Sequence, residues 1–309
     1  MKRKQLKDLD LLDNFLFGKM MTSAEFKEDF ARTILEIVLK RSFSSLKVVP
    51  QKTIFGADTG LHGARLDVYL EEDTSTENAA VLDMEPEKDS RQKSVTALPK
   101  RVRYYHSLID NGILESGEGY QALRPVYVIM FLPFDPFGMN HMVYTIRNHC
   151  IELPDLPYED GATTIFLYTK GEKGIPSEEL AQLLRYMEST KSENAVNDTL
   201  RRLDDMVSHI KSKKEVSLEY MKSWEYEQMI REIAEEEGLA AGMAKGMAKG
   251  MADGMAKGMA DGMAKGMAAG EARIIRAMLD SGMSVGQIAG ILKMAPDEIE
   301  ELLSLAKTV

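Results

Sequence analysis

Residues 242–270 form a tetrapeptide repeat, which limits where a globular fold can be built. The segment reads GMAK GMAK GMAD GMAK GMAD GMAK GMAA G, with Gly and Met at the start of each unit. Ala, Met and Lys favour a helix, while each Gly costs about 1 kcal/mol relative to Ala. Four residues turn a helix by about 400°, so the Gly and Met stripes drift and make no fixed apolar face. Two interpretations are open: a marginal helix or flexible spacer, or close helix–helix contact in a homo-oligomer through the C-terminal helices.

The repeat separates a globular part of the 309-residue chain from a tail. Residues 1–175 mix strand and helix patterns, which predicts an α/β core. Residues 176–237 carry apolar residues three and four apart and are predicted to form a helical extension that starts at Ser177. Beyond the repeat segment 238–270, residues 271–309 are expected to form three short helices.

This tail has the length pattern of a helix-turn-helix. Its second helix is predicted to start at Ser284, because Gln287 follows three residues later and completes a capping box. Four carboxylates on the last helix would repel DNA phosphates, so we interpret the tail as a packing or dimerisation element. These carboxylates belong to Asp297, Glu298, Glu300 and Glu301.

Composition excludes several classes of protein. The 39 Lys and Arg against 49 Asp and Glu give a net charge of −10, which rules out a globally basic coat for nucleic acid. Cys150 is the only cysteine, so neither an intramolecular disulfide nor a cysteine metal cluster can form. The N-terminus lacks a signal-peptide pattern, and the longest apolar run, IMFL, is far short of the roughly 20 residues of a membrane helix. We expect a cytoplasmic protein with no membrane partner.

Two strands between residues 63 and 88 carry the acidic residues of most chemical interest. GARLDVYLEE alternates so that Asp67 faces away from Leu66, Val68 and Leu70. AAVLDMEPE places Val81, Asp83, Glu85 and Glu87 on one side, and the polar stretch DTSTEN between the strands predicts a hairpin loop.

An antiparallel pairing of these strands would bring two carboxylates together. If Asp67 lies opposite Glu85, paired residue numbers add to 152 and the turn is centred at residue 76, inside the polar loop. Opposed Cβ atoms are about 5 Å apart, so the two carboxylates can share one divalent cation. Mg²⁺ or Mn²⁺ held in this way suits phosphodiester hydrolysis. Acidic residues in hairpins are also typical of solvated surfaces, and this alternative stays open.

A basic helix is predicted directly after the hairpin, in LPKRVRYYHSLID. Its cationic and aromatic side chains would form a nucleic-acid clamp beside the carboxylates. An amphipathic helix with Val102, Tyr105 and Ile109 inward explains the same pattern. The residues predicted to bind nucleic acid are Lys100, Arg101, Arg103, Tyr104 and Tyr105.

The ordered stretches LLDNFLFGKMM, RLDVY, LDMEPE, LPKRVRYYHSLID and YVIMFLPFDPFG resemble the PD-(D/E)xK nuclease family transposases, also described as recombination-promoting nucleases. The resemblance covers residues 10–150. It implies a restriction-endonuclease-like core, a central mixed sheet flanked by helices. It also implies that Asp67 is the first metal ligand, that Glu85 is the second, and that Glu36 is a helical acid assisting the metal.

Glu87 departs from the pattern of the superfamily, because it occupies the position of the motif lysine. Lys88 is one residue away and is expected to face the other side of the strand. Lys100 or Arg103 is therefore expected to supply the positive charge. Pro86 cannot donate a ladder hydrogen bond, which predicts a sheet edge or a bulge there.

These observations predict a Mg²⁺-dependent DNA endonuclease linked to transposition or recombination. Asp67, Glu85, Glu87 and Glu36 are its candidate catalytic residues, with Asp67 and Glu85 as the metal ligands. The missing lysine favours an alternative, a catalytically degenerate member that binds DNA or assembles without cleavage. A purely structural oligomer built on the tail is the third possibility.

Overall fold

The computed structural model describes residues 4–54, 64–73, 79–114 and 117–305. The chain divides into two compact units, Met1–Trp224 and Glu225–Val309. The first unit holds the sheet and the helices that pack on it, and the second is helical. Among the described residues, no helix combines the length and the apolar character needed to cross a membrane.

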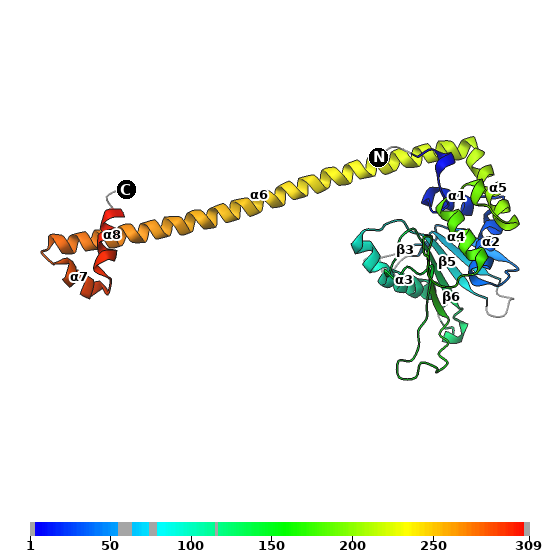
Figure 1. Cartoon of the computed structure of the whole chain (residues 1–309), viewed down its shortest axis with the longest axis horizontal. Coiled ribbons are helices and arrows are strands. Elements are labelled where there is room, and N and C mark those ends of the chain that lie inside the picture. Colours follow the sequence, from blue (N-terminus) through cyan, green and yellow to red (C-terminus); the bar gives the residue numbers. More distant parts are fainter. Residues whose placement is uncertain (1–3, 55–63, 74–78, 115–116, 306–309) are drawn as a thin grey trace. The chain divides into compact units, whose positions relative to one another are not determined.

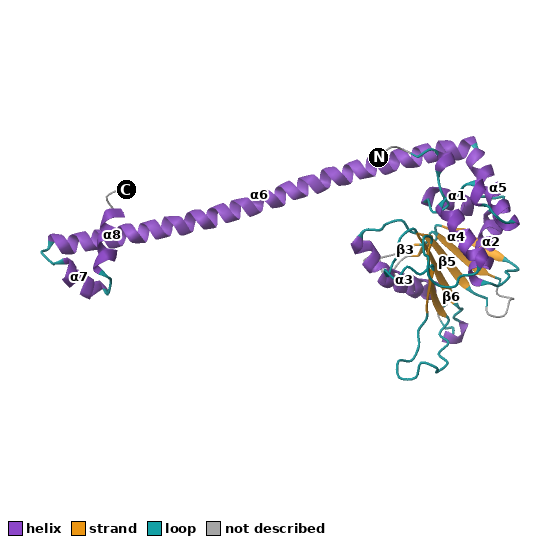
Figure 2. Ribbon diagram, in the orientation of Figure 1, coloured by secondary structure: helices purple, strands orange, loops and turns teal. Residues whose placement is uncertain are grey.

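A mixed six-stranded sheet forms the centre of the first unit (Figure 2). Its strand order is β1-β4-β5-β6-β8-β7; β5, β6 and β8 run parallel, and the other neighbouring pairs are antiparallel. A separate two-stranded sheet pairs β2 with β3. The strands are β1 (Leu46–Pro50), β2 (Thr53–Ile54), β3 (Ala64–Arg65), β4 (Val68–Glu72), β5 (Val81–Pro86), β6 (Val126–Leu132), β7 (Val143–Ile146) and β8 (Ala162–Tyr168).

Helices cover both faces of the sheet, so an α/β fold with a mixed sheet flanked by helices is confirmed (Figure 1). One face packs on α1, α2, α4 and α5, and the other on α3. The helices are α1 (Asn14–Thr22), α2 (Lys27–Leu39), α3 (Gln92–Ile113), α4 (Glu178–Glu188), α5 (Asp198–Ser212), α6 (Lys214–Asp280), α7 (Val285–Leu292) and α8 (Pro296–Leu305), with 3₁₀ turns η1 (Leu6–Asp8), η2 (Tyr120–Ala122) and η3 (Ser192–Asn194).

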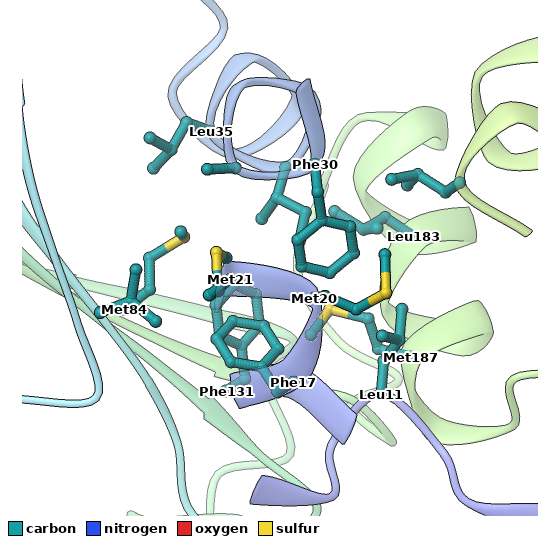
Figure 3. Close-up of a cluster of buried hydrophobic side chains, with 14 of the residues drawn as sticks. Leu11, Phe17, Met20, Met21, Phe30, Leu35, Met84, Phe131, Leu183 and Met187 are labelled. Carbon is teal, nitrogen blue, oxygen red and sulfur yellow. The ribbon is translucent and has the colours of Figure 1, made fainter. Parts of the chain in front are cut away.

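The larger core lies between the sheet and the four-helix face. Figure 3 shows Phe17, Met20 and Met21 of α1 beside Phe30 of α2, with Phe131 reaching them from β6. All five side chains are fully buried, and the Phe17 ring meets the Phe30 ring edge-on at 5.9 Å. The predicted start of α4 is confirmed, because the Ser177 side chain accepts the Leu180 amide hydrogen.

The register of the β4–β5 hairpin is as predicted. Val68 lies opposite Met84 and Tyr69 opposite Asp83, so paired residue numbers add to 152. Val81, Asp83 and Glu85 face α3, whereas Leu82 and Met84 face the larger core. The expected turn centre at residue 76 lies outside the described residues.

The strand before this hairpin differs from the prediction in one respect. Leu66 was expected on the same side as Val68 and Leu70, but it packs in the core under α3. The chain bends at Asp67 between β3 and β4, because Leu66 donates its N–H to the Lys52 carbonyl and Asp67 accepts from the Gln51 N–H. The bend interrupts the two-residue alternation.

The prediction for Pro86 was also wrong, because β5 is a central strand. Pro86 is its last residue and lies beside Phe131 of β6. The ladder to β4 has already ended at the Val68–Met84 pair, so no hydrogen bond from residue 86 is needed on that side.

The repeat is helical throughout, inside α6. Its methionines, one every four residues from Met243 to Met267, are 63–80% exposed. The first of the three short tail helices expected after the repeat is not separate, because α6 continues to Asp280. The capping box of Ser284 and Gln287 is confirmed at the start of α7. Ile275, Ile288 and Ile299 form a small core between the end of α6, α7 and α8.

Candidate active site

The bend before β4 and the end of β5 bring the two predicted metal ligands together. The Asp67 amide donates a hydrogen bond of 2.7 Å to Oε1 of Glu85. Glu85 is only 5% exposed, and Asp67 is half-buried. Asp67 continues the hairpin register by one residue, which places it across from Glu85 as predicted.

Asp83 is a third carboxylate in this group, and it was not among the predicted site residues. Its side chain is 0% exposed, and within the described residues neither of its oxygens has a hydrogen-bond partner. Burial, followed by the negative charges of Glu85 and Asp67, raises the pKa of Asp83 well above its ordinary value. Its signal in the sequence is its position two residues before Glu85 on the same side of the strand.

Glu85 is electrostatically linked to both aspartates. Burial and then the charge of Asp67 raise the pKa of Glu85 to about 8. The hydrogen bond from the Asp67 amide and then the positive charge of Arg101 oppose this rise. Buried carboxyl groups that favour protonation, as Asp83 and Glu85 do, are equally well neutralised by a bound cation.

The positive charge of Arg101 on α3 acts on Asp83 and Glu85, whereas Lys100 or Arg103 was expected to supply this charge. Nη1 of Arg101 donates to Oε2 of Glu87 at 2.6 Å. Its guanidinium carbon is 5.8 Å from the centre of the Tyr105 ring. The helix α3 begins at Gln92, six residues before the stretch LPKRVRYYHSLID, and Asp89 accepts hydrogen bonds from Arg91 and Ser94 near that start.

Lys88 points away from the carboxylates, as predicted. Its Nζ lies 3.2 Å from Oδ2 of Asp13, the residue that caps α1 on the opposite side of the sheet. Glu36 is also remote from the cluster, because α2 packs on that same opposite face. Oε1 of Glu36 accepts the Phe43 amide hydrogen at 3.1 Å, which stabilises the turn after α2. The structure therefore does not bring Glu36 together with Asp67 and Glu85.

The remaining predicted nucleic-acid ligands lie along α3. Lys100 and Arg103 are exposed, whereas Tyr104 and Tyr105 are half-buried. Burial and then the negative charge of Glu85 raise the pKa of Tyr105. Val102 and Ile109 are buried under the helix, as an amphipathic pattern requires.

The donor chemistry of the cluster suits a hard divalent cation. In the described part of the chain, no three His, Cys, Asp or Glu side chains already stand in a metal-binding arrangement. Asp83 nevertheless offers two buried oxygens without partners, and Asp67 and Glu85 place further carboxylates on the same side of the hairpin. Carboxylate oxygens are the ligands that Mg²⁺ and Mn²⁺ prefer.

Comparisons with protein-family models, with curated proteins and with solved structures find no significant match to this chain.

Proposed function

We propose that this protein is a Mg²⁺- or Mn²⁺-dependent DNA endonuclease with a restriction-endonuclease-like core, linked to transposition or recombination. One observation carries the proposal: Asp83 is fully buried with both carboxylate oxygens unpartnered among the described residues, beside Asp67 and Glu85. Burying a carboxylate without a donor costs several kcal/mol unless a proton or a cation neutralises it. The motifs shared with PD-(D/E)xK nuclease family transposases support the same assignment.

In this proposal Asp67 and Glu85 hold the metal, and Asp83 adds a third carboxylate. A bound Mg²⁺ would lower the pKa of an attacking water and neutralise charge that develops on the phosphate. The Asp67 amide orients the Glu85 carboxylate through their 2.7 Å hydrogen bond. Arg101, fixed by Glu87, contributes positive charge at the edge of the cluster.

DNA is the proposed substrate because α3 presents cations next to the carboxylates. Lys100 and Arg103 are exposed, and each can contact a phosphate without breaking an ion pair in the described part of the chain. The acidic α8 does not provide such a surface, which is consistent with a packing function for the tail.

A degenerate protein that binds DNA without cutting it is the second candidate. The observation that favours it is the Arg101–Glu87 ion pair, which occupies the position of the motif lysine. An arginine stays protonated at any ordinary pH, so Arg101 cannot accept a proton from the attacking water as a lysine can. Both the endonuclease and the degenerate protein are expected to bind metal, but only the endonuclease is expected to cleave DNA.

A plasmid-nicking assay with Mg²⁺, Mn²⁺ or EDTA tests the proposal. Asp67→Asn and Glu85→Gln keep the side-chain shape and remove a ligand charge, so each should reduce nicking by at least about 100-fold. Glu36→Gln is the matched control, because Glu36 is a carboxylate on the other side of the sheet and its nicking rate should equal that of the parent. Nicking that is unaffected by EDTA or by Asp67→Asn would contradict the assignment. Mn²⁺ binding by calorimetry without any nicking would favour the degenerate protein.

A further inference from the structure

A concave feature lies on the same face of the sheet as the carboxylates, along α3. It is a pocket of about 380 Å³ between α3, β8 and the segment around β7. This volume is within the roughly 300–1,000 Å³ of pockets that hold small ligands. Its walls include Val102 and His106 of α3, Thr164 and Phe166 of β8, and Ile146 of β7.

The sheet register relates this pocket to the candidate active site. Asp83 lies beside Val128 of β6, Val128 beside Thr164 of β8, and Thr164 beside Ile146 of β7. These residues therefore form one row across one face. Neighbouring strands are about 4.8 Å apart, so Thr164 lies about 10 Å from Asp83 along the row. A polymeric ligand that is bound at the carboxylates can therefore reach the pocket with a segment only a few monomers long.

Aromatic side chains line the wall of the pocket opposite α3. The Phe137 ring stands edge-on to the Phe166 ring at 5.3 Å and to the Tyr144 ring at 4.9 Å. Phe137 remains 37% exposed and Ile146 is 49% exposed. A planar aromatic ligand can stack on such a surface with little loss of side-chain entropy.

The charged groups of the pocket are complementary to an anion. Arg103 and Arg147 both line it, and neither has an ion pair or side-chain hydrogen bond within the described residues. The neighbouring carboxylate of Asp160 accepts a 2.6 Å hydrogen bond from Asn148 instead. Burial lowers the pKa of His106, so this residue is neutral at pH 7. Its Nε2 lies 3.0 Å from the Thr164 hydroxyl, and its Nδ1 has no partner among the described residues.

We infer that this pocket binds one nucleotide of a DNA strand, with the base stacked on Phe137 and the phosphates held by Arg103 and Arg147. The inference rests on the proposed DNA endonuclease function and adds a substrate subsite to it. An apolar aromatic wall with two arginines that have no ion pair among the described residues suits a base joined to a phosphate better than it suits either an uncharged apolar molecule or a bare anion.

Calorimetry with the full chain in EDTA tests the subsite without any catalysis. The probes are a 5′-phosphorylated thymidine trinucleotide, an abasic chain of the same charge, thymidine monophosphate and inorganic phosphate. We expect the trinucleotide to bind at least about 5-fold more tightly than the abasic chain, because one base stacks on an aromatic side chain. Phe137→Ala should remove this difference, and Ile146→Ala, on a half-exposed strand end, should reduce it.

The arginines should affect all phosphate-bearing probes alike. Arg103→Ala and Arg147→Ala should each weaken the binding of the trinucleotide and of the abasic chain. Each should also reduce the slope of log K against log salt concentration by about one, the value for one phosphate contact. Arg185→Ala is the matched control, because Arg185 lies on α4, which packs on the opposite face of the sheet, and its variant should bind as the parent does.

Three outcomes would overturn the subsite: equal affinity for the trinucleotide and the abasic chain, an unchanged preference in a folded Phe137→Ala variant, or thymidine monophosphate binding as tightly as the trinucleotide. The last result would indicate a free nucleotide as the ligand. Asp67→Asn separates this test from that of the proposed function, because it should abolish nicking and leave trinucleotide binding in EDTA unchanged. If the parent nicks DNA but shows no preference for the trinucleotide over the abasic chain, the nucleotide subsite is wrong and the proposed endonuclease function still stands.

Discussion

Glu85→Gln should stabilise the metal-free protein at pH 8 and remove part of its pH dependence. Glu85 has a pKa of about 8 in the folded protein against an ordinary value of 4.5. Because the folded state binds this proton more tightly than the unfolded chain does, the stabilisation is complete below pH 4.5 and is lost as the pH rises to about 8. At about 1.36 kcal/mol per pKa unit, the loss is at most about 5 kcal/mol.

Urea denaturation in EDTA at several pH values between 4.5 and 8 measures this effect. The parent's free energy of unfolding also changes through other carboxylates, including Asp110, whose pKa is raised by burial. The difference between parent and Glu85→Gln reports Glu85 together with its interaction with Asp83, because the other groups titrate in both proteins. Glu179→Gln, at an exposed position in the first turn of α4, is the control and should titrate as the parent does.

Mg²⁺ provides the second half of the test. A ligand that binds only the folded state stabilises it by about 2.7 kcal/mol at 100 times its dissociation constant. Mg²⁺ should therefore stabilise the parent at pH 8 and leave Glu85→Gln nearly unchanged. If the difference between the two proteins does not vary with pH, Glu85 titrates normally and the account of a crowded, buried carboxylate cluster is wrong.

Four further changes follow from other contacts. Asp83→Asn should raise the melting temperature in EDTA and abolish Mn²⁺ binding by calorimetry, because it removes a buried carboxyl that must take up a proton or a cation when the chain folds. Arg101→Ala should cost about 2 kcal/mol in urea denaturation by leaving Glu87 unpaired, whereas Arg91→Ala, at an exposed pair, should cost far less. Deleting residues 250–257 should leave the melting temperature of the sheet unit and its metal binding unchanged; a large drop would show that the repeat packs on the core. Gly254→Ala should increase helicity by circular dichroism, because the added Cβ meets no atom within 4 Å. Lower molecular mass of this variant by light scattering would instead reveal close helix contacts in a homo-oligomer.

The hairpin register was predictable because two independent constraints agree. The two-residue alternation of each strand restricts Asp67 and Glu85 to compatible sides, and the polar loop fixes where the turn is centred. The ladder from Val68–Met84 to Glu71–Val81 follows that register. By contrast, the side of Leu66 depends on hydrogen bonds between the bend at Asp67 and the distant residues Gln51 and Lys52. The sequence around Leu66 contains no pattern that predicts these contacts.

Tertiary context also decided which basic residue lies next to the carboxylates. Lys100, Arg101 and Arg103 are nearly adjacent in the sequence, so their spacing alone does not distinguish them. The rotation of α3 on the sheet does, because Val102 is buried beneath it and Arg101 is turned toward Glu87. The helical state of the repeat was equally difficult to assign, since its glycines oppose a helix while its other residues favour one.

Burial distinguishes the two interpretations of the acidic hairpin that the sequence left open. A solvated surface would leave its carboxylates hydrated, but Asp83 is 0% exposed and Glu85 is 5% exposed. A structural role would supply donors, as Arg41 does for the buried Glu72 through two hydrogen bonds of 2.7 and 2.8 Å on the same sheet. Asp83 has no such donor in the described part of the chain, although its neighbours Val81 and Val128 on the same face of the sheet show that apolar side chains pack well there. A cost of this kind is expected where a carboxylate is kept for what it binds.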